Sequence, residues 1–201
     1  MSLGVGDAGF GYGGVPLFAG LSFEVGAGEA VAIVGANGSG KSTLLRCLVG
    51  AEVLDSGHVL FGGASLDESS DAFRAAVASL LDDADYFPDV SVVEHLRLLA
   101  WLHSSSADVP EVLAEVGLTA VADQLPPTLS SGQRHRLGLA SCFVRPREVL
   151  VLDEPEQRLD AAGRAWLRTR LRAEKEAGVA VVFASHDHEL VEAVACRTVT
   201  L

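Results

Sequence analysis

The sequence predicts an α/β fold with three parts: a core with a mostly parallel β-sheet, an antiparallel β lobe at the N-terminus, and an inserted helical lobe. Short apolar runs alternate with amphipathic helical segments in the last third of the chain, and the middle third is largely helical. Alternation of apolar strands with helices is typical of a parallel sheet that helices cover on both faces. We expect one domain over residues 1–201, with residues 1–85 and 146–201 forming the core and β lobe, and residues 86–145 forming the helical lobe.

The first elements of the chain are strands. Residues 1–29 contain short alternating apolar stretches and glycine-rich turns, which predict the β lobe. Residues 30–34 form an apolar run that predicts a buried strand. A glycine-rich loop follows this run, and the leucines after the loop lie on one face of a helix that ends at Gly50. Residues 59–61 predict one more short strand before the helical region.

The later elements carry recognisable start signals. Ser91 and Glu94 have the spacing of a capping box ahead of a leucine-rich segment. Asp108 opens a second helix that has Pro110 in its first turn. The remaining predictions are a helix from about residue 131 that stops before Pro146, strands over 149–152, 179–184 and 198–201, and helices over 160–177 and 187–194.

Composition and charge exclude several classes of protein. Hydrophobic residues make up 49% of the 201 residues, enough for a sizeable core. The net charge is −12, whereas contact with a nucleic-acid backbone needs clustered Lys and Arg, so we expect no nucleic-acid partner. We find no window of about 18 apolar residues that predicts a membrane span, and the N-terminus does not resemble a signal peptide. We therefore expect a cytoplasmic protein, and its three widely separated cysteines agree with free thiols in a reducing compartment.

A glycine-rich loop carries the first functional motif. Residues 35–42 read Gly-Ala-Asn-Gly-Ser-Gly-Lys-Ser and fit the P-loop pattern G-x-x-x-x-G-K-[ST] in full, between a strand and a helix. The glycines let backbone N–H groups turn inward toward phosphate oxygens, and the helix N-terminus favours negative charge. Lys41 would contact the β- and γ-phosphates, and the Ser42 hydroxyl would contact Mg²⁺. The candidate nucleotide-binding residues of this loop are Gly35, Ala36, Asn37, Gly38, Ser39, Gly40, Lys41, Ser42 and Thr43.

Two adjacent carboxylates follow a later strand. Four apolar residues run directly into Asp153 and Glu154, and ligands of α/β sheets bind at the carboxyl ends of strands. Asp153 there can hold Mg²⁺, and Glu154 can accept a proton from an attacking water. A cation is part of this interpretation because two neighbouring carboxylates repel each other without one. A plain turn after a strand is the alternative, and the P-loop upstream makes it the weaker one.

The most specific motif is the segment Leu129, Ser130, Ser131, Gly132 and Gln133. It closely resembles LSGGQ, the signature of ABC (ATP-binding cassette) ATPases, and the resemblance covers essentially the whole chain. Ser130 and the N–H groups around Gly132 would stand at a helix N-terminus, which attracts anions. In this family the signature of one subunit closes on the ATP that the other subunit binds. The resemblance therefore implies a dimer, either a homodimer or a pair with another ABC subunit, that holds two ATP at its interface.

Further family elements occur in the expected order. Tyr12 lies upstream of the P-loop, where the family has an aromatic ring that stacks on adenine, although Phe10 or Phe18 could supply this ring instead. Residues 157–160 resemble the D-loop. His186 follows an apolar strand and resembles the H-loop histidine that contacts the γ-phosphate. By this resemblance Glu154, His186 and Lys41 are the candidate catalytic residues, and ATP and Mg²⁺ are the expected ligands.

The chain departs from the family pattern at several positions. Alignment of residues 86–88 with the family places Asp82 where a Gln contacts Mg²⁺ and the attacking water. Asp is shorter than Gln and charged, so Asp82 joins Ser42 and Asp153 as a candidate metal contact with reduced reach; a solvated acidic loop is the alternative. Ser131 replaces the first signature glycine, and Glu156 replaces the usual Thr.

The resemblance implies the ATPase subunit of a transporter. ATP binding would close the dimer and hydrolysis would reopen it, which would power a separate integral membrane subunit on the inner face of the cell membrane. Coupling would run through the groove between the core and the helical lobe, near residues 82–95. The alternatives are a soluble ABC ATPase of DNA repair or translation, a catalytically weak regulatory cassette, and a P-loop kinase or nucleotide switch. The sequence identifies neither the cargo nor its direction, because the membrane partner selects them.

Overall fold

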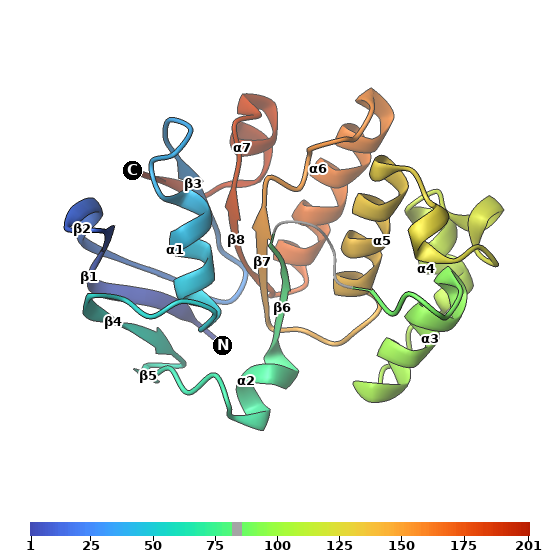
Figure 1. The fold of residues 1–201 in the computed structure, drawn as a ribbon, viewed down its shortest axis with the longest axis horizontal. Helices are drawn as coiled ribbons and strands as arrows, with labels where there is room; N and C mark the ends of the chain where they lie inside the picture. The colour runs from blue at the N-terminus through green and yellow to red at the C-terminus, as the bar shows by residue number, and fades with distance from the viewer. Residues whose placement is uncertain (82–85) are drawn as a thin grey trace.

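The computed structural model describes residues 1–81 and 86–201, and within them the strands form two sheets (Figure 1). The first sheet is antiparallel and has the order β2-β1-β4-β5. Its strands are β1 (Leu3–Tyr12), β2 (Val15–Val25), β4 (Ser56–Phe61) and β5 (Ala64–Ser65). This sheet is the predicted β lobe.

The second sheet is parallel, as the alternation of strands and helices predicted, and has the order β6-β7-β8-β3-β9. Its strands are β3 (Ala30–Val34), β6 (Val77–Leu80), β7 (Val149–Asp153), β8 (Ala180–Ala184) and β9 (Arg197–Thr200). Strands 30–34 and 149–153 are buried on both faces, so their sequences are apolar throughout. The two sheets with their helices confirm the predicted fold class.

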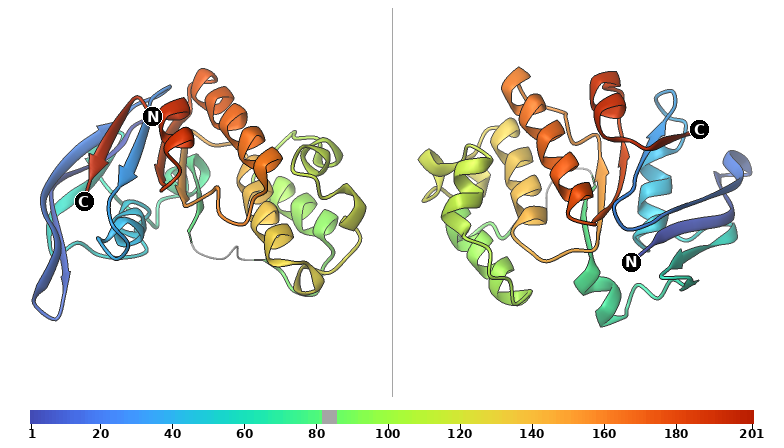
Figure 2. Two further views of the ribbon diagram at one scale, coloured as in Figure 1. Left: turned by 90° about the horizontal axis from the view of Figure 1, so that it is seen from above. Right: turned by 180° about the vertical axis from the view of Figure 1, so that it is seen from behind.

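The helices divide between the core and one side of the molecule (Figures 1 and 2). They are α1 (Lys41–Leu48), α2 (Asp71–Ala76), α3 (Val92–Leu102), α4 (Val109–Glu115), α5 (Ser131–Phe143), α6 (Ala161–Glu176) and α7 (His188–Val194), with short 3₁₀ turns at Thr119–Val121 and Pro126–Thr128. Helices α3 and α4 lie beside α5, away from the β lobe. The helix α2 and the strand β6 were not predicted from the sequence.

Alternate residues of the central strands pack on opposite sides of the parallel sheet. Val149 and Val151 join a cluster that fills the space between the two sheets, where α1 contributes its leucines. Leu150 and Leu152 join a second cluster with α5, α6 and α7. A third cluster belongs to the helical region around α3, α4 and α5. Because α5 contributes residues to the second and third clusters, it joins the helical region to the core.

Candidate functional site

The P-loop connects the end of β3 to the start of α1. Gly40 is the residue before α1 and has a φ of 100°, a left-handed conformation that favours glycine. A Cβ atom at Gly40 would lie 3.2 Å from atoms of Leu17 and Phe18, so space is also limited there. The Lys41 side chain is buried, and its Nζ donates hydrogen bonds to the carbonyl oxygens of Gly35 and Ala36 at 3.0 Å each. The ammonium group is therefore held at the centre of the loop.

The loop is suited to hold phosphate groups. Gly38 has a φ of 79° and no atom within 4 Å of the position of a Cβ, so the backbone is open on that side. The Ser39 hydroxyl is buried, and its oxygen has no hydrogen-bond partner among the residues that the structure describes. The N–H groups at the start of α1 face the same region and favour an anion. Positive charge, open backbone and an available hydroxyl together fit a triphosphate.

A pocket of about 540 Å³ lies over this loop. The residues that line it are Tyr12, Leu17, Asn37, Gly38, Gly40, Lys41, Ser42, Thr43 and Glu154. Tyr12 is 58% exposed and forms a T-shaped contact with Phe10 at a centroid distance of 5.1 Å. Phe10 and Phe18 are both buried. Of the three aromatic candidates for adenine stacking, Tyr12 is the one that borders the pocket.

The two carboxylates lie at the carboxyl end of β7. Asp153 is the last residue of the strand, and Glu154 follows with a φ of 44°, which is uncommon for a residue other than glycine. The Glu154 N–H donates to the Ala184 carbonyl at 2.9 Å, which ties this turn to the end of β8. Backbone strain of this kind is concentrated at functional sites, where the surrounding structure enforces it. Glu154 lines the P-loop pocket.

Glu154 has two side-chain neighbours. One carboxylate oxygen accepts a hydrogen bond from the Gln157 amide, and the other lies 3.4 Å from Nε2 of His186. His186 is exposed, whereas Glu154 is partly buried. The structure thus brings together two of the three residues predicted to be catalytic, Glu154 and His186, and places the first beside the pocket that also contains Lys41.

The metal candidates fit Mg²⁺ only together with a nucleotide. Among the described residues, no cluster of three or more His, Cys, Asp or Glu side chains could hold a metal. Ser42 has an exposed side chain at the start of α1, and Asp153 lies at the end of the neighbouring strand β7. Mg²⁺ commonly binds one or two protein oxygens plus phosphate oxygens and water, which such a sparse set would allow. Asp82, the third candidate, lies outside the described residues.

The signature segment forms the start of α5. Ser130 is its N-cap and forms a capping box with Gln133: the Gln133 N–H donates to the Ser130 Oγ at 3.2 Å, and the Ser130 N–H donates to the Gln133 side chain at 2.9 Å. Leu129 is buried and anchors the segment, whereas Ser130 and Ser131 are exposed. A Cβ at Gly132 would lie 3.1 Å from the Arg158 carbonyl oxygen, so the D-loop passes close by.

The P-loop and the signature lie along one edge of the molecule. In the view of Figure 1 the P-loop, the carboxyl end of β7 and the start of α5 all lie at the upper edge. Within the described part of the chain, however, residues 129–133 do not line the pocket over the P-loop. The structure therefore places the P-loop, the carboxyl end of β7 and the signature at one edge, with the signature apart from the P-loop pocket.

Sequence reasoning overlooked the contacts of Glu156. This side chain is buried, and its Oε1 accepts hydrogen bonds from the Ser185 hydroxyl at 2.5 Å and from the His186 N–H at 3.3 Å. Burial raises the pKa of the Glu156 carboxyl above its usual value. The sequence marked Glu156 only as a departure from a family pattern, and no local pattern links it to a segment about thirty residues further along the chain.

Known proteins share both the sequence pattern and the fold. Residues 18–157 match the family model described as ABC transporter. The chain is 40% identical over 195 residues to the cobalt import ATP-binding protein CbiO of Rhodobacter capsulatus, covering 92% of this chain and 69% of that protein. It is 35% identical over 185 residues to an uncharacterized ABC transporter ATP-binding protein, YdbJ of Bacillus subtilis, covering 90% of this chain and 60% of the length of YdbJ.

A solved structure agrees with these matches. The ATP-binding subunit of an ABC transporter superposes with a TM-score of 0.89 at 25% identity, covering 100% of this chain and 86% of that chain. The chain therefore belongs to the ABC transporter family, as an ATP-binding cassette of the ATPase type. Within the described residues, no helix combines the length and the hydropathy that a crossing of the bilayer requires.

Proposed function

We propose that this chain is the ATP-hydrolysing subunit of an ABC transporter and that it acts as a dimer around two ATP. The observation that carries the proposal is the separation between the open pocket over the P-loop and the exposed, capped start of α5. Within the described part of one chain, these two candidate phosphate-binding sites do not share a pocket. A second ABC subunit in the opposite orientation would bring its own Ser130 segment to the phosphates bound at Lys41.

In the proposed reaction, the residues along this edge of the molecule have separate chemical roles. Lys41 and the loop backbone bind the β- and γ-phosphates, and Tyr12 stacks on the base. Ser42 and Asp153 hold Mg²⁺, which neutralises phosphate charge when it is bound. Glu154 accepts the proton of the attacking water, and His186, 3.4 Å from Glu154, contacts the γ-phosphate. Gln157, which now donates to Glu154, would leave that oxygen when water binds there.

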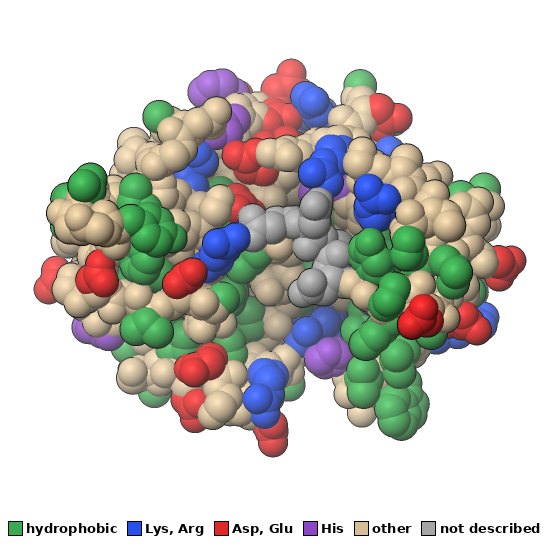
Figure 3. Space-filling view, in the orientation of Figure 1, with side chains coloured by type: hydrophobic (Ala, Val, Ile, Leu, Met, Phe, Trp, Pro, Cys, Tyr) green, Lys and Arg blue, Asp and Glu red, His purple; other side chains and the backbone are tan. Residues whose placement is uncertain are grey.

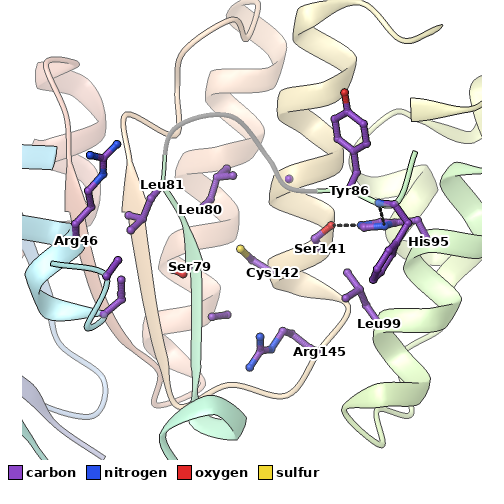
Figure 4. A pocket seen from close by; sticks show the side chains of 15 residues that line it. Arg46, Ser79, Leu80, Leu81, Tyr86, His95, Leu99, Ser141, Cys142 and Arg145 are labelled. Atoms are coloured by element: carbon purple, nitrogen blue, oxygen red, sulfur yellow. Dashed lines mark hydrogen bonds between the residues drawn. The ribbon is translucent and has the colours of Figure 1, made fainter. Parts of the chain in front are cut away.

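A groove on the side of the helical region is the proposed contact with a membrane subunit. A pocket of about 560 Å³ lies between α1, β6, α3 and α5, with apolar side chains such as Leu81, Phe87 and Leu99 in its lining (Figure 4). Figure 3 shows hydrophobic side chains gathered over α3 beside this recess, where Trp101 is 74% exposed. An exposed apolar surface of this kind is typical of a protein contact. We place the chain on the inner face of the cell membrane, bound to a partner through this groove.

The carboxylate of Glu154 gives the sharpest test. In the variant Glu154→Gln we expect ATP to bind but turnover to fall by about 10²-fold or more, because general-base catalysis is lost. Because ATP then stays bound, the variant should accumulate as a dimer with Mg-ATP, which light scattering after size exclusion measures. Glu176→Gln, at the exposed end of α6, is the matched control and should hydrolyse ATP like the unmodified protein. A Glu154→Gln protein that stays monomeric with Mg-ATP would contradict the proposed dimer.

A further inference from the structure

Glu156 occupies an unusual place for an acidic residue. It is 7% exposed and lies in the turn between β7 and α6, two residues after Glu154. Its Oε1 accepts from both Ser185 and His186, whereas its Oε2 is buried and has no hydrogen-bond partner among the described residues. A buried carboxylate costs free energy unless its hydrogen bonds offset the loss of water. The hydrogen bonds to Oε1 offset part of this cost, and they join the turn after β7 to Ser185 and His186.

These contacts fix the backbone that carries His186. The Ser185 hydroxyl donates to Glu156 and accepts from the Asp187 N–H at 2.9 Å. The Asp187 carboxylate in turn caps the start of α7 by accepting from the Leu190 N–H at 3.1 Å. His186 itself donates its N–H to Glu156. Residues 185–187, which belong to neither β8 nor α7, are thus tied to the turn after β7 through the oxygen Oε1.

The same turn is also held from its other side. The His135 Nε2 lies 2.8 Å from the Pro155 carbonyl oxygen, and His135 is a buried residue of α5, the helix that begins with the signature. The Glu154 N–H donates to Ala184. Residues 154–156 are therefore fixed to α5 and to the end of β8, so Glu156 is a rigid point from which to hold His186.

We propose that Glu156 is a positioning residue for ATP hydrolysis: its Oε1 holds the backbone of His186 so that the imidazole stays beside Glu154. The His186 side chain is exposed, and its Nε2 lies 3.4 Å from a carboxylate oxygen of Glu154. Its placement therefore depends on the backbone more than on packing of the ring. A small displacement of a catalytic group can lower the rate by a large factor. The proposal rests on the proposed function, since it assigns His186 a part in that reaction.

Two substitutions of matched length separate the role of the acceptor oxygen from that of packing. Glu156→Gln keeps an oxygen that can accept from Ser185 and His186, whereas Glu156→Met has a similar length and no such acceptor. We expect Glu156→Met to lower kcat about tenfold or more, with the KM for ATP changed by less than about twofold. Glu156→Gln should retain most of the kcat. Ser185→Ala, which removes the shorter of the two hydrogen bonds to Oε1, should also lower kcat.

The assay is steady-state ATP hydrolysis by the whole chain, together with ATP affinity by calorimetry and the thermal unfolding of each variant. A Glu156→Met protein with unchanged kcat would overturn the proposal, and so would a Glu156→Gln protein that loses as much kcat as Glu156→Met. If Glu156→Met does not fold, Ser185→Ala decides in its place, and an unchanged kcat there overturns the proposal. Failure of the proposed function looks different: the unmodified protein would not hydrolyse ATP, or Glu154→Gln would hydrolyse it at the normal rate.

Discussion

At the scale of single residues, the P-loop depends on the compact positive charge of one lysine. The chain contains 15 Lys and Arg residues, of which only Lys41 and Lys175 are lysine. The compact ammonium of Lys41 fits among the loop carbonyls at 3.0 Å, where a planar guanidinium would not find the same room. Lys175, near the end of α6, donates to the carbonyl of Val194, the last residue of α7, and so joins these two helices.

The residue Asp82 gives a prediction at the same scale. The proposed site gives it a share in the binding of Mg²⁺, so the neutral and longer side chain of Asp82→Gln should shift the Mg²⁺ concentration for half-maximal ATP hydrolysis, by about tenfold if the effect equals that of a supporting ligand. Asp89→Asn, an exposed acid a few residues further along, is the control and should leave this concentration unchanged. Titration of the ATPase rate with Mg²⁺ measures both variants. No change in rate or in Mg²⁺ dependence for Asp82→Gln would remove Asp82 from the metal site.

At the scale of elements, helix starts were the best predicted features. Ser91 was predicted as a cap from its spacing to Glu94, and the structure shows the complete capping box. Asp108 and Ser130 also cap the helices that were predicted to begin beside them. Such contacts span three residues, so the sequence contains all the information that they need. The short helix α2 and strand β6 were missed because six and four residues carry too little periodicity to identify an element.

The buried ion pair between the loop after α5 and the helix α6 gives a prediction about stability. Arg147 donates from its Nε to Glu174 at 2.8 Å, and Arg170 lies 2.8 Å from the same carboxylate. The Arg147 and Glu174 side chains are 10% and 6% exposed. Glu174→Ala leaves a buried guanidinium without its main partner, so we expect the free energy of unfolding to fall by about 3 kcal/mol.

Urea denaturation followed by circular dichroism measures this loss. Glu176→Ala, on the exposed side of the same helix end, is the matched control and should change the free energy of unfolding by less than about 0.5 kcal/mol. Because Glu174 lies away from the P-loop pocket, the ATP affinity of the folded Glu174→Ala protein should be unchanged. A loss no larger than that of the control would show that the three carbonyl oxygens around the Arg147 Nη1 suffice to hold it.

At the scale of the whole molecule, the sequence predicted a parallel sheet but not the order of its strands. Strand β3 lies between β8 and β9 although β3 comes more than a hundred residues earlier in the chain. No local pattern encodes such a pairing, because it depends on how distant segments pack. The same reason explains why the contact of Glu156 with Ser185 was missed while the P-loop was found. A motif whose residues lie within a few positions of one another can be recognised in a sequence, whereas a contact between distant segments can be seen only in the folded structure.

The separation of the P-loop from the signature within one chain leads to the last prediction. Lys41→Met disables the nucleotide site of a subunit, and Ser130→Arg disables its signature, so either protein alone should have little ATPase activity. A mixed dimer of the two has one complete site, made of the P-loop of the Ser130→Arg subunit and the signature of the Lys41→Met subunit. An equal mixture should therefore recover activity, up to about a quarter of the unmodified rate if subunits pair at random and sites act independently.

The mixture is compared with each variant alone at the same total concentration, and the ATPase rate is the measurement. Mixing Lys41→Met with the double variant Lys41→Met, Ser130→Arg is the control, because no dimer of these proteins contains an intact P-loop. Recovery in the first mixture and none in the second requires that the signature acts on the nucleotide of the other subunit. If the first mixture stays at the sum of its parts, the exposed start of α5 does not complete the site of a second copy, and its place at the same edge as the P-loop would need another explanation.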